Sequence, residues 1–213
     1  GPGPSNAHPE VLKALSLNPI GHLDDAYLEL MSDVQELLRY AWQCNNRVSL
    51  PMSGTGSAAM EASIANFIEE EETILIAKKG YFGDRLVDMA SRYKANVVVI
   101  EKEWGEAFSL DEIKFEIEKN KPSIFAIVHA ETSTGVLQPL DGIGEICRKN
   151  NCLFLVDAVT SLGAVKLLVD DWKIDLAYSC SQKGLSCPPG LSPFTMNNRA
   201  EEKLINRKTK VPN

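Results

Sequence analysis

Short apolar runs alternate with stretches of helical periodicity along most of this chain. The runs predicted as strands are residues 48–52, 73–77, 96–100, 124–129, 152–156 and 176–179. The segments predicted as helices are residues 8–17, 24–43, 58–67, 85–93, 110–120 and 142–150. Strands that alternate with helices need right-handed crossovers, which produce a mainly parallel sheet covered on both faces. The sequence therefore predicts an α/β fold, a three-layer sandwich, with the continuously apolar runs 97–100 and 124–128 as central strands.

The composition is that of one globular domain. With 213 residues the chain can build one substantial core, and we expect a single domain over residues 1–213. No apolar run approaches membrane-spanning length, so no membrane partner is expected. The net charge of −7 favours solubility and argues against nucleic acid as a partner.

Cysteine and histidine usage argues against a metal site. The five cysteines form no C-x-x-C pair and the three histidines are scattered, so neither a metal site nor a disulfide framework is expected. Reduced thiols and the lack of a signal peptide favour a cytoplasmic location. The chain begins without Met and ends without a closing element, so we expect both ends to be cut. A peroxisomal or other organellar location therefore stays open.

A lysine and an aspartate lie just beyond two of the predicted strands. Lys183 lies in a loop of small and polar residues, 179–184, and Asp157 ends the apolar run 153–156. Ligands of parallel sheets bind at the carboxyl ends of the strands, and a carboxylate there needs a partner. A surface lysine and a solvated loop aspartate are the alternatives. Together the two residues suit pyridoxal phosphate, because a lysine forms a Schiff base with its aldehyde and a carboxylate pairs with its protonated ring nitrogen.

Three further segments offer groups to the same edge of the sheet. Residues 53–57, Ser-Gly-Thr-Gly-Ser, form a strand-to-helix turn whose backbone N–H groups suit a phosphate, although a plain N-cap is the alternative. Phe82 lies between two glycines and offers an aromatic face, unless it belongs to the core. Residues 129–135 offer hydroxyl groups, among them that of Thr132, unless the segment is only a turn.

Taken together, four segments resemble the alanine–glyoxylate (serine–pyruvate) aminotransferases, a family in the class V branch of fold-type I pyridoxal phosphate enzymes. The segments are residues 1–6 (GPGPSN), 53–56 (SGTG), 129–136 (HAETSTGV) and 179–184 (SCSQKG). The resemblance runs over the whole chain and implies a pyridoxal phosphate cofactor and a homodimer. It assigns nine residues to the cofactor. Those next to the phosphate are Thr55, Gly56, Ser57 and Gln182, and those next to the ring are Phe82, Thr132, Asp157, Val159 and the Schiff-base lysine, Lys183.

The chain also departs from this family. Many members have Trp where this chain has Phe82, which gives a smaller stacking surface. Members continue well past Asn213, and that later part supplies a second domain, the arginine that binds the substrate carboxylate, and a Tyr and a Thr for the phosphate of the partner subunit. We therefore expect the chain to be the large, cofactor-binding domain, without the N-terminal arm and the C-terminal small domain.

Three functional hypotheses follow. The first is transamination between a small amino acid, alanine or serine, and a 2-oxo acid, glyoxylate or pyruvate, with Lys183 also acting as the general base. The second is a cysteine desulfurase-like enzyme of the same branch. Those enzymes have histidines where this chain has Gln182 and Phe82, which argues against it. The third is a large-domain fragment that is catalytically incomplete.

Overall fold

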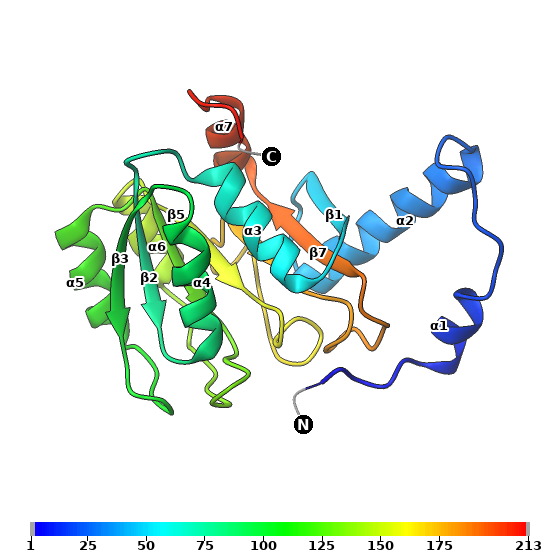
Figure 1. Cartoon of the computed structure of the whole chain (residues 1–213), viewed down its shortest axis with the longest axis horizontal. Helices are drawn as coiled ribbons and strands as arrows, with labels where there is room; N and C mark the ends of the chain where they lie inside the picture. The colour runs from blue at the N-terminus through cyan, green and yellow to red at the C-terminus, as the bar shows by residue number, and fades with distance from the viewer. Residues whose placement is uncertain (1–2, 212–213) are drawn as a thin grey trace.

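The computed structural model describes residues 3–211, in which the strands form one seven-stranded sheet of order β1-β7-β6-β5-β4-β2-β3 (Figure 1). The first two residues of the GPGPSN segment, Gly1 and Pro2, lie outside the described residues, as do Pro212 and Asn213. The strands are β1 (Val48–Ser53), β2 (Thr73–Lys78), β3 (Asn96–Glu101), β4 (Ile124–Val128), β5 (Leu153–Asp157), β6 (Leu176–Tyr178) and β7 (Leu191–Met196). The helices are α1 (Pro9–Ala14), α2 (Asp25–Trp42), α3 (Gly56–Phe67), α4 (Tyr81–Ser91), α5 (Leu110–Asn120), α6 (Ile143–Lys149) and α7 (Asn198–Ile205).

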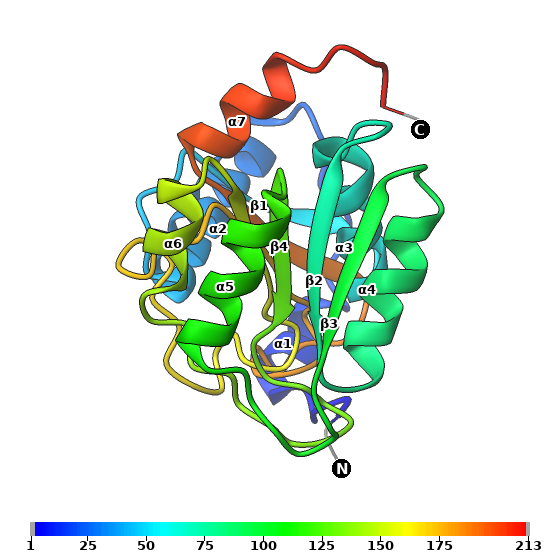
Figure 2. The same ribbon diagram turned by 90° about the vertical axis from the view of Figure 1, so that its left-hand side faces the viewer.

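The sheet is parallel from β3 through β6, as predicted. Helices cover both of its faces, which confirms the three-layer arrangement; Figure 2 shows α5 and α6 on one side of the strands and α3 and α4 on the other. Each face has its own core. One contains Trp42 of α2 with Ile113 and Ile117 of α5, and the other contains Ile64 of α3 with Leu86 of α4.

The strand β7 and the helix α7 were not predicted. β7 runs antiparallel between β1 and β6. It contains Pro193, which lacks the N–H that a central strand normally donates. The structure places Pro193 opposite Pro51 of β1. Opposite residues in an antiparallel ladder alternate between pairs that exchange hydrogen bonds and pairs that do not. Two prolines fit a pair of the second kind, so the ladder between β1 and β7 loses no hydrogen bond at this position.

The prediction that residues 97–100 form a central strand is wrong, because β3 lies at the edge of the sheet. Val97 and Val98 pack against different cores, so both faces of β3 are partly covered and its sequence does not alternate. Val99 is 40% exposed, as an edge position allows. The same prediction for 124–128 is confirmed, since all of β4 is buried between β2 and β5.

The N-terminal helices lie apart from the sheet. α2 reaches the core only through its last turns, where Leu38 and Trp42 are buried, and α1 has no buried residue. In Figure 1 both helices project to the right, and the segment before α1 returns beneath the sheet. That return brings residues 3–5 to the edge where the parallel strands end.

Candidate active site

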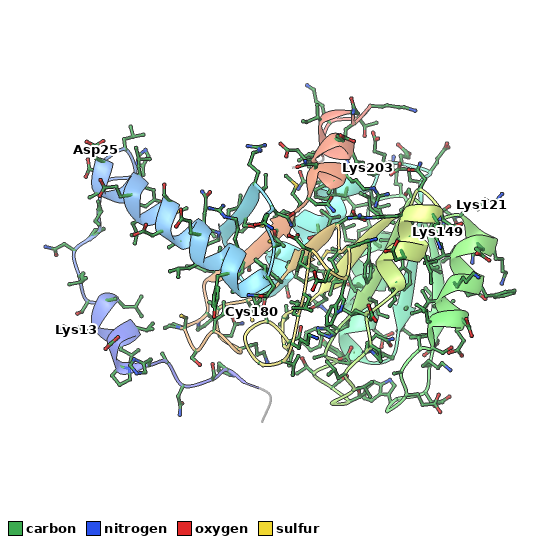
Figure 3. The ribbon with its side chains drawn as sticks, turned by 180° about the vertical axis from the view of Figure 1, so that it is seen from behind. Lys13, Asp25, Lys121, Lys149, Cys180 and Lys203 are labelled. Carbon is green, nitrogen blue, oxygen red and sulfur yellow. The ribbon has the colours of Figure 1, made fainter. Side chains whose placement is uncertain are left out.

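One cavity lies at the carboxyl ends of β5 and β6, beside the first turns of α3 and α4. Its volume is about 200 Å³, and it brings together eight of the nine predicted site residues. A larger hollow of about 470 Å³ lies between the end of α2 and residues 168–171, away from these strand ends. Figure 3 shows Cys180, which lines the site cavity, at the lower side of the sheet, opposite Lys203 of α7. The residues lining the site cavity are Thr55, Gly56, Ser57, Met60, Phe82, Asp157, Val159, Cys180, Gln182 and Lys183.

The N-terminus of α3 forms one wall of this cavity. Thr55 is the N-cap residue, and its hydroxyl does not cap the helix. A Cβ atom on Gly56 would lie 3.0 Å from Cγ2 of Val159 and 3.3 Å from Cβ of Cys180, so glycine lets the helix start close to both loops. The first N–H groups of a helix have no partner within it and carry the positive end of its dipole. This wall is therefore suited to a phosphate.

Gln182 contributes a second polar group to the same cavity. Its Oε1 atom is buried and has no hydrogen-bond partner among the described residues. Buried amide groups are normally hydrogen-bonded. Rotating the side-chain amide by half a turn would place its NH₂ group where Oε1 now lies, and that group could donate to a phosphate oxygen. The site thus fits an anionic group that accepts hydrogen bonds.

Asp157 provides a buried carboxylate at the end of β5. It is 2% exposed, and it accepts hydrogen bonds from the hydroxyl of Tyr178 (2.7 Å) and the backbone N–H of Val159 (2.9 Å). Burial raises the pKa of Asp157 from 3.8 to about 6, although both hydrogen bonds oppose the rise. A buried anion is stabilised by a cation or a charged donor, and the protonated ring nitrogen of pyridoxal phosphate is such a group. Tyr178 lies beside Asp157 through strand register, a relation that the sequence analysis missed.

The loop that carries Lys183 is held by the N-terminal segment. The backbone N–H of Ser5 donates to the carbonyl of Gln182 (2.8 Å), and its hydroxyl donates to the carbonyl of Lys183 (2.7 Å). A Cβ on Gly3 would lie 2.8 Å from Cδ and 3.0 Å from Nζ of Lys183. Gly3 has φ of +129°, so a side chain there would be strained as well as crowded. Gly3 and Ser5 of the GPGPSN segment therefore lie directly against the candidate Schiff-base lysine and its loop.

Two site predictions need adjustment. Phe82 lies in the first turn of α4, because this helix begins at Tyr81 and not at residue 85 as predicted. Thr132 is not among the residues that line the cavity, and its hydroxyl bonds instead to the hydroxyl of Thr160 at 2.5 Å. Between residues 3 and 211, no three His, Cys, Asp or Glu side chains come together as ligands for a metal ion. The helices described there are all too short or too polar to cross a membrane.

The sequence and the fold both match known aminotransferases. Residues 12–210 match the aminotransferase class-V family. (S)-Ureidoglycine–glyoxylate transaminase of Bacillus subtilis is 44% identical over 97% of this chain and 50% of its own length. Alanine–glyoxylate aminotransferase of Mus musculus is 42% identical over 99% of this chain and 51% of its own.

A solved structure agrees with these sequence matches. The crystal structure of alanine–glyoxylate aminotransferase from Nostoc sp. superposes with a TM-score of 0.98 at 60% identity, covering 100% of this chain and 56% of that one. This chain spans about half the length of the curated relatives that it matches. The residue pattern, the fold and the family match agree, and the chain belongs to the class-V aminotransferase family.

Proposed function

We propose that this chain is the cofactor-binding large domain of a pyridoxal-phosphate-dependent aminotransferase about twice its length, which we call the parent protein. One observation carries the proposal: a single cavity contains a lysine, a buried carboxylate and a helix N-terminus. These are the three groups that hold the aldehyde carbon, the ring nitrogen and the phosphate of that cofactor. The match to the class-V family supports it.

Each side chain of the cavity has a part in this proposal. Pyridoxal phosphate, when bound, supplies an aldehyde and a ring that withdraws electrons from the substrate. The first N–H groups of α3 and the amide of Gln182 bind its phosphate. Phe82 and Val159 lie against the faces of the ring, and the charged Asp157 keeps the ring nitrogen protonated. Lys183 holds the cofactor covalently and carries a proton to and from the substrate Cα atom.

For the reaction, we propose transfer of the amino group of alanine or serine to glyoxylate or pyruvate. The names of the relatives support glyoxylate more strongly than any one donor, because one relative is named for alanine and the other for (S)-ureidoglycine, and both for glyoxylate. The desulfurase-like alternative is disfavoured by Gln182 and Phe82, which stand where that group has histidines. Incubating the parent protein with each donor and glyoxylate, beside cysteine, distinguishes these reactions. Sulfide release without glycine formation would contradict the proposal.

The 213-residue chain by itself is expected to bind pyridoxal phosphate weakly and to transaminate slowly or not at all. The substrate-carboxylate arginine implied by the family resemblance would lie beyond Asn213. A hydrogen bond to a charged group is worth about 1.5–3 kcal/mol. The measurement is glycine formation from alanine and glyoxylate by the chain and by the parent protein at equal molar concentration. Equal rates would contradict the expectation and would place substrate binding within these residues.

We further propose that the parent protein is a homodimer, with α1, α2 and the segment between them at the interface. These elements carry apolar side chains that the described residues leave uncovered: Leu12, Leu15, Leu17, Ile20, Leu23, Leu28, Leu30, Leu37 and Tyr40. Exposed apolar residues concentrated in one region are typical of an interaction surface. Light scattering of the parent protein at micromolar concentration is expected to give twice the subunit mass. A monomer under those conditions would contradict the proposal.

A further inference from the structure

The N-terminus of α4 is capped by a loop that follows another strand. Gly80, its N-cap residue, has no side chain to accept hydrogen bonds from the first turn. Those bonds go to residues 131–133 instead. The N–H groups of Phe82 and Gly83 point to Oε1 and Oε2 of Glu131 at 3.4 and 3.3 Å, and the N–H of Tyr81 donates to the hydroxyl of Ser133 at 3.0 Å. The first three N–H groups of α4 are therefore all satisfied from one loop.

This contact depends on close approach. A Cβ atom on Gly80 would lie 2.5 Å from Cγ of Glu131 and 2.6 Å from Oγ of Ser133, so only glycine leaves room for the carboxylate. The hydroxyl of Ser133 also donates to Oε1 of Glu131 at 2.8 Å. The loop is itself closed by two backbone bonds, from the N–H of Glu131 to the carbonyl of Val136 and from the N–H of Gly135 to the carbonyl of Glu131. Glu131 is thus fixed to the end of β4, and it fixes the start of α4.

A second buried charge, that of Lys79, interacts electrostatically with the carboxylate of Glu131. Lys79, the residue between β2 and Gly80, is 1% exposed, as is Glu131. Its Nζ atom has no hydrogen-bond partner within residues 3–211. Burial lowers the pKa of Lys79 to about 8, while the negative charges of Glu131 and Asp157 oppose that fall. The neighbouring His129 is neutral at pH 7, because burial and the charge of Lys79 lower its pKa to about 4. Glu131 and Asp157 therefore place two buried carboxylates near the one ammonium of Lys79, and a protonated cofactor ring would supply a second cation there.

From this geometry we propose that Glu131 is a positioning residue, which holds the first turn of α4 so that Phe82 lies against the cofactor ring. The inference rests on the proposed function for the cofactor, but the capping contact itself does not. Phe82 lines the cavity, and Glu131 accepts a hydrogen bond from the backbone N–H of Phe82. Displacing that turn would move the aromatic ring without removing any group that touches the cofactor.

The test replaces Glu131 by glutamine in the parent protein and uses three readouts. Glutamine keeps the shape but presents one NH₂ group to a helix N-terminus that needs acceptors. In the cofactor-free parent protein, hydrogen exchange of a peptide covering residues 81–83 should become faster. Titration with pyridoxal phosphate should show affinity weaker by about fivefold to tenfold, the effect of losing one helix cap. The induced circular dichroism of the bound cofactor should decrease at saturation.

A double substitution separates positioning from general weakening. In a Phe82→Ala background, Glu131→Gln should change the affinity for pyridoxal phosphate little, because the side chain that it positions is already gone. Equal effects in both backgrounds, or unchanged exchange in residues 81–83, would overturn the inference. If the unsubstituted parent protein does not bind pyridoxal phosphate at all, the proposed function fails and the role toward Phe82 fails with it. If the unsubstituted protein binds pyridoxal phosphate normally and Glu131→Gln has the same effect in both backgrounds, this inference is overturned and the proposed function is not.

The chain offers a matched control. Glu112 is also a glutamate at a helix N-terminus: as part of the capping box of α5 it accepts from the N–H of Ser109 at 2.8 Å, and it lies outside the cavity. Glu112→Gln should leave the affinity unchanged. Should Glu131→Gln not fold, Ser133→Ala removes the acceptor for Tyr81 and one donor to Glu131 but keeps the carboxylate, and should give a smaller change in the same direction.

Discussion

Replacing Lys183 by alanine is expected to abolish both covalent attachment of pyridoxal phosphate and amino transfer. Lys183 is the one lysine among the described residues that line the cavity. Removing the proton carrier alone should lower the rate by about 10²–10⁴-fold, and loss of the covalent link adds to this. Borohydride reduction of the unsubstituted parent protein with its cofactor, followed by peptide mapping, should place the pyridoxyl group on Lys183. The variant should give no such peptide.

Two comparisons make this test specific. Lys94 is a surface lysine paired with Glu70, so Lys94→Ala should keep both the adduct and the activity. Lys79 is the most instructive competitor, because its pKa is lowered to about 8 by burial and it follows β2 of the same sheet directly. It faces Glu131 and Asp157 and does not line the cavity. An adduct on Lys79 in the Lys183→Ala variant would show that the covalent role has been assigned to the wrong lysine.

The parallel part of the sheet could be predicted because its strands are buried. β4 and the first four residues of β5 are apolar, and β5 ends on Asp157, which lines the cavity. β7 could not be recognised in the same way, since Pro193 argues against a central strand and the partners of β7 are distant in the sequence. The edge position of β3 could not be predicted either, because both of its faces are partly covered by the two cores and its sequence does not alternate. These features depend on pairing partners that local sequence does not contain.

The same distinction applies to the site. Lys183, Asp157 and the turn around Gly56 follow predicted strands directly, so strand order places them at one edge. Glu131 and Tyr178 act through contacts between segments 49 and 21 residues apart, and only the assembled sheet shows which groups they meet. Glu131 was within a segment that the sequence had already marked, but its role as a helix cap could not be recognised there. The start of α4 at Tyr81 was unknown.

Replacing Asp157 is expected to have opposite effects on catalysis and on the stability of the cofactor-free chain. In the parent protein, Asp157→Ala should lower turnover by several orders of magnitude, because nothing would keep the ring nitrogen protonated. Asp157→Asn should do much the same, although it keeps the shape and the acceptor for the N–H of Val159. Steady-state amino transfer measures both. A loss smaller than about tenfold, roughly 1.4 kcal/mol of barrier, would contradict the role of this carboxylate.

Without cofactor, the charge of Asp157 is a cost to folding. Burial raises its pKa from 3.8 to about 6, so the folded chain binds the proton more tightly than the unfolded chain does. The stabilisation is complete below pH 3.8 and is lost as the pH rises through about 6, a change of about 3 kcal/mol. Asp157→Asn removes this dependence. Urea unfolding of the cofactor-free chain between pH 4 and 7 should therefore show the asparagine variant gaining stability relative to the unsubstituted chain as the pH rises. A difference in unfolding free energy that stays constant across that range would contradict the description of Asp157 as a buried anion without a cationic partner in the cofactor-free chain.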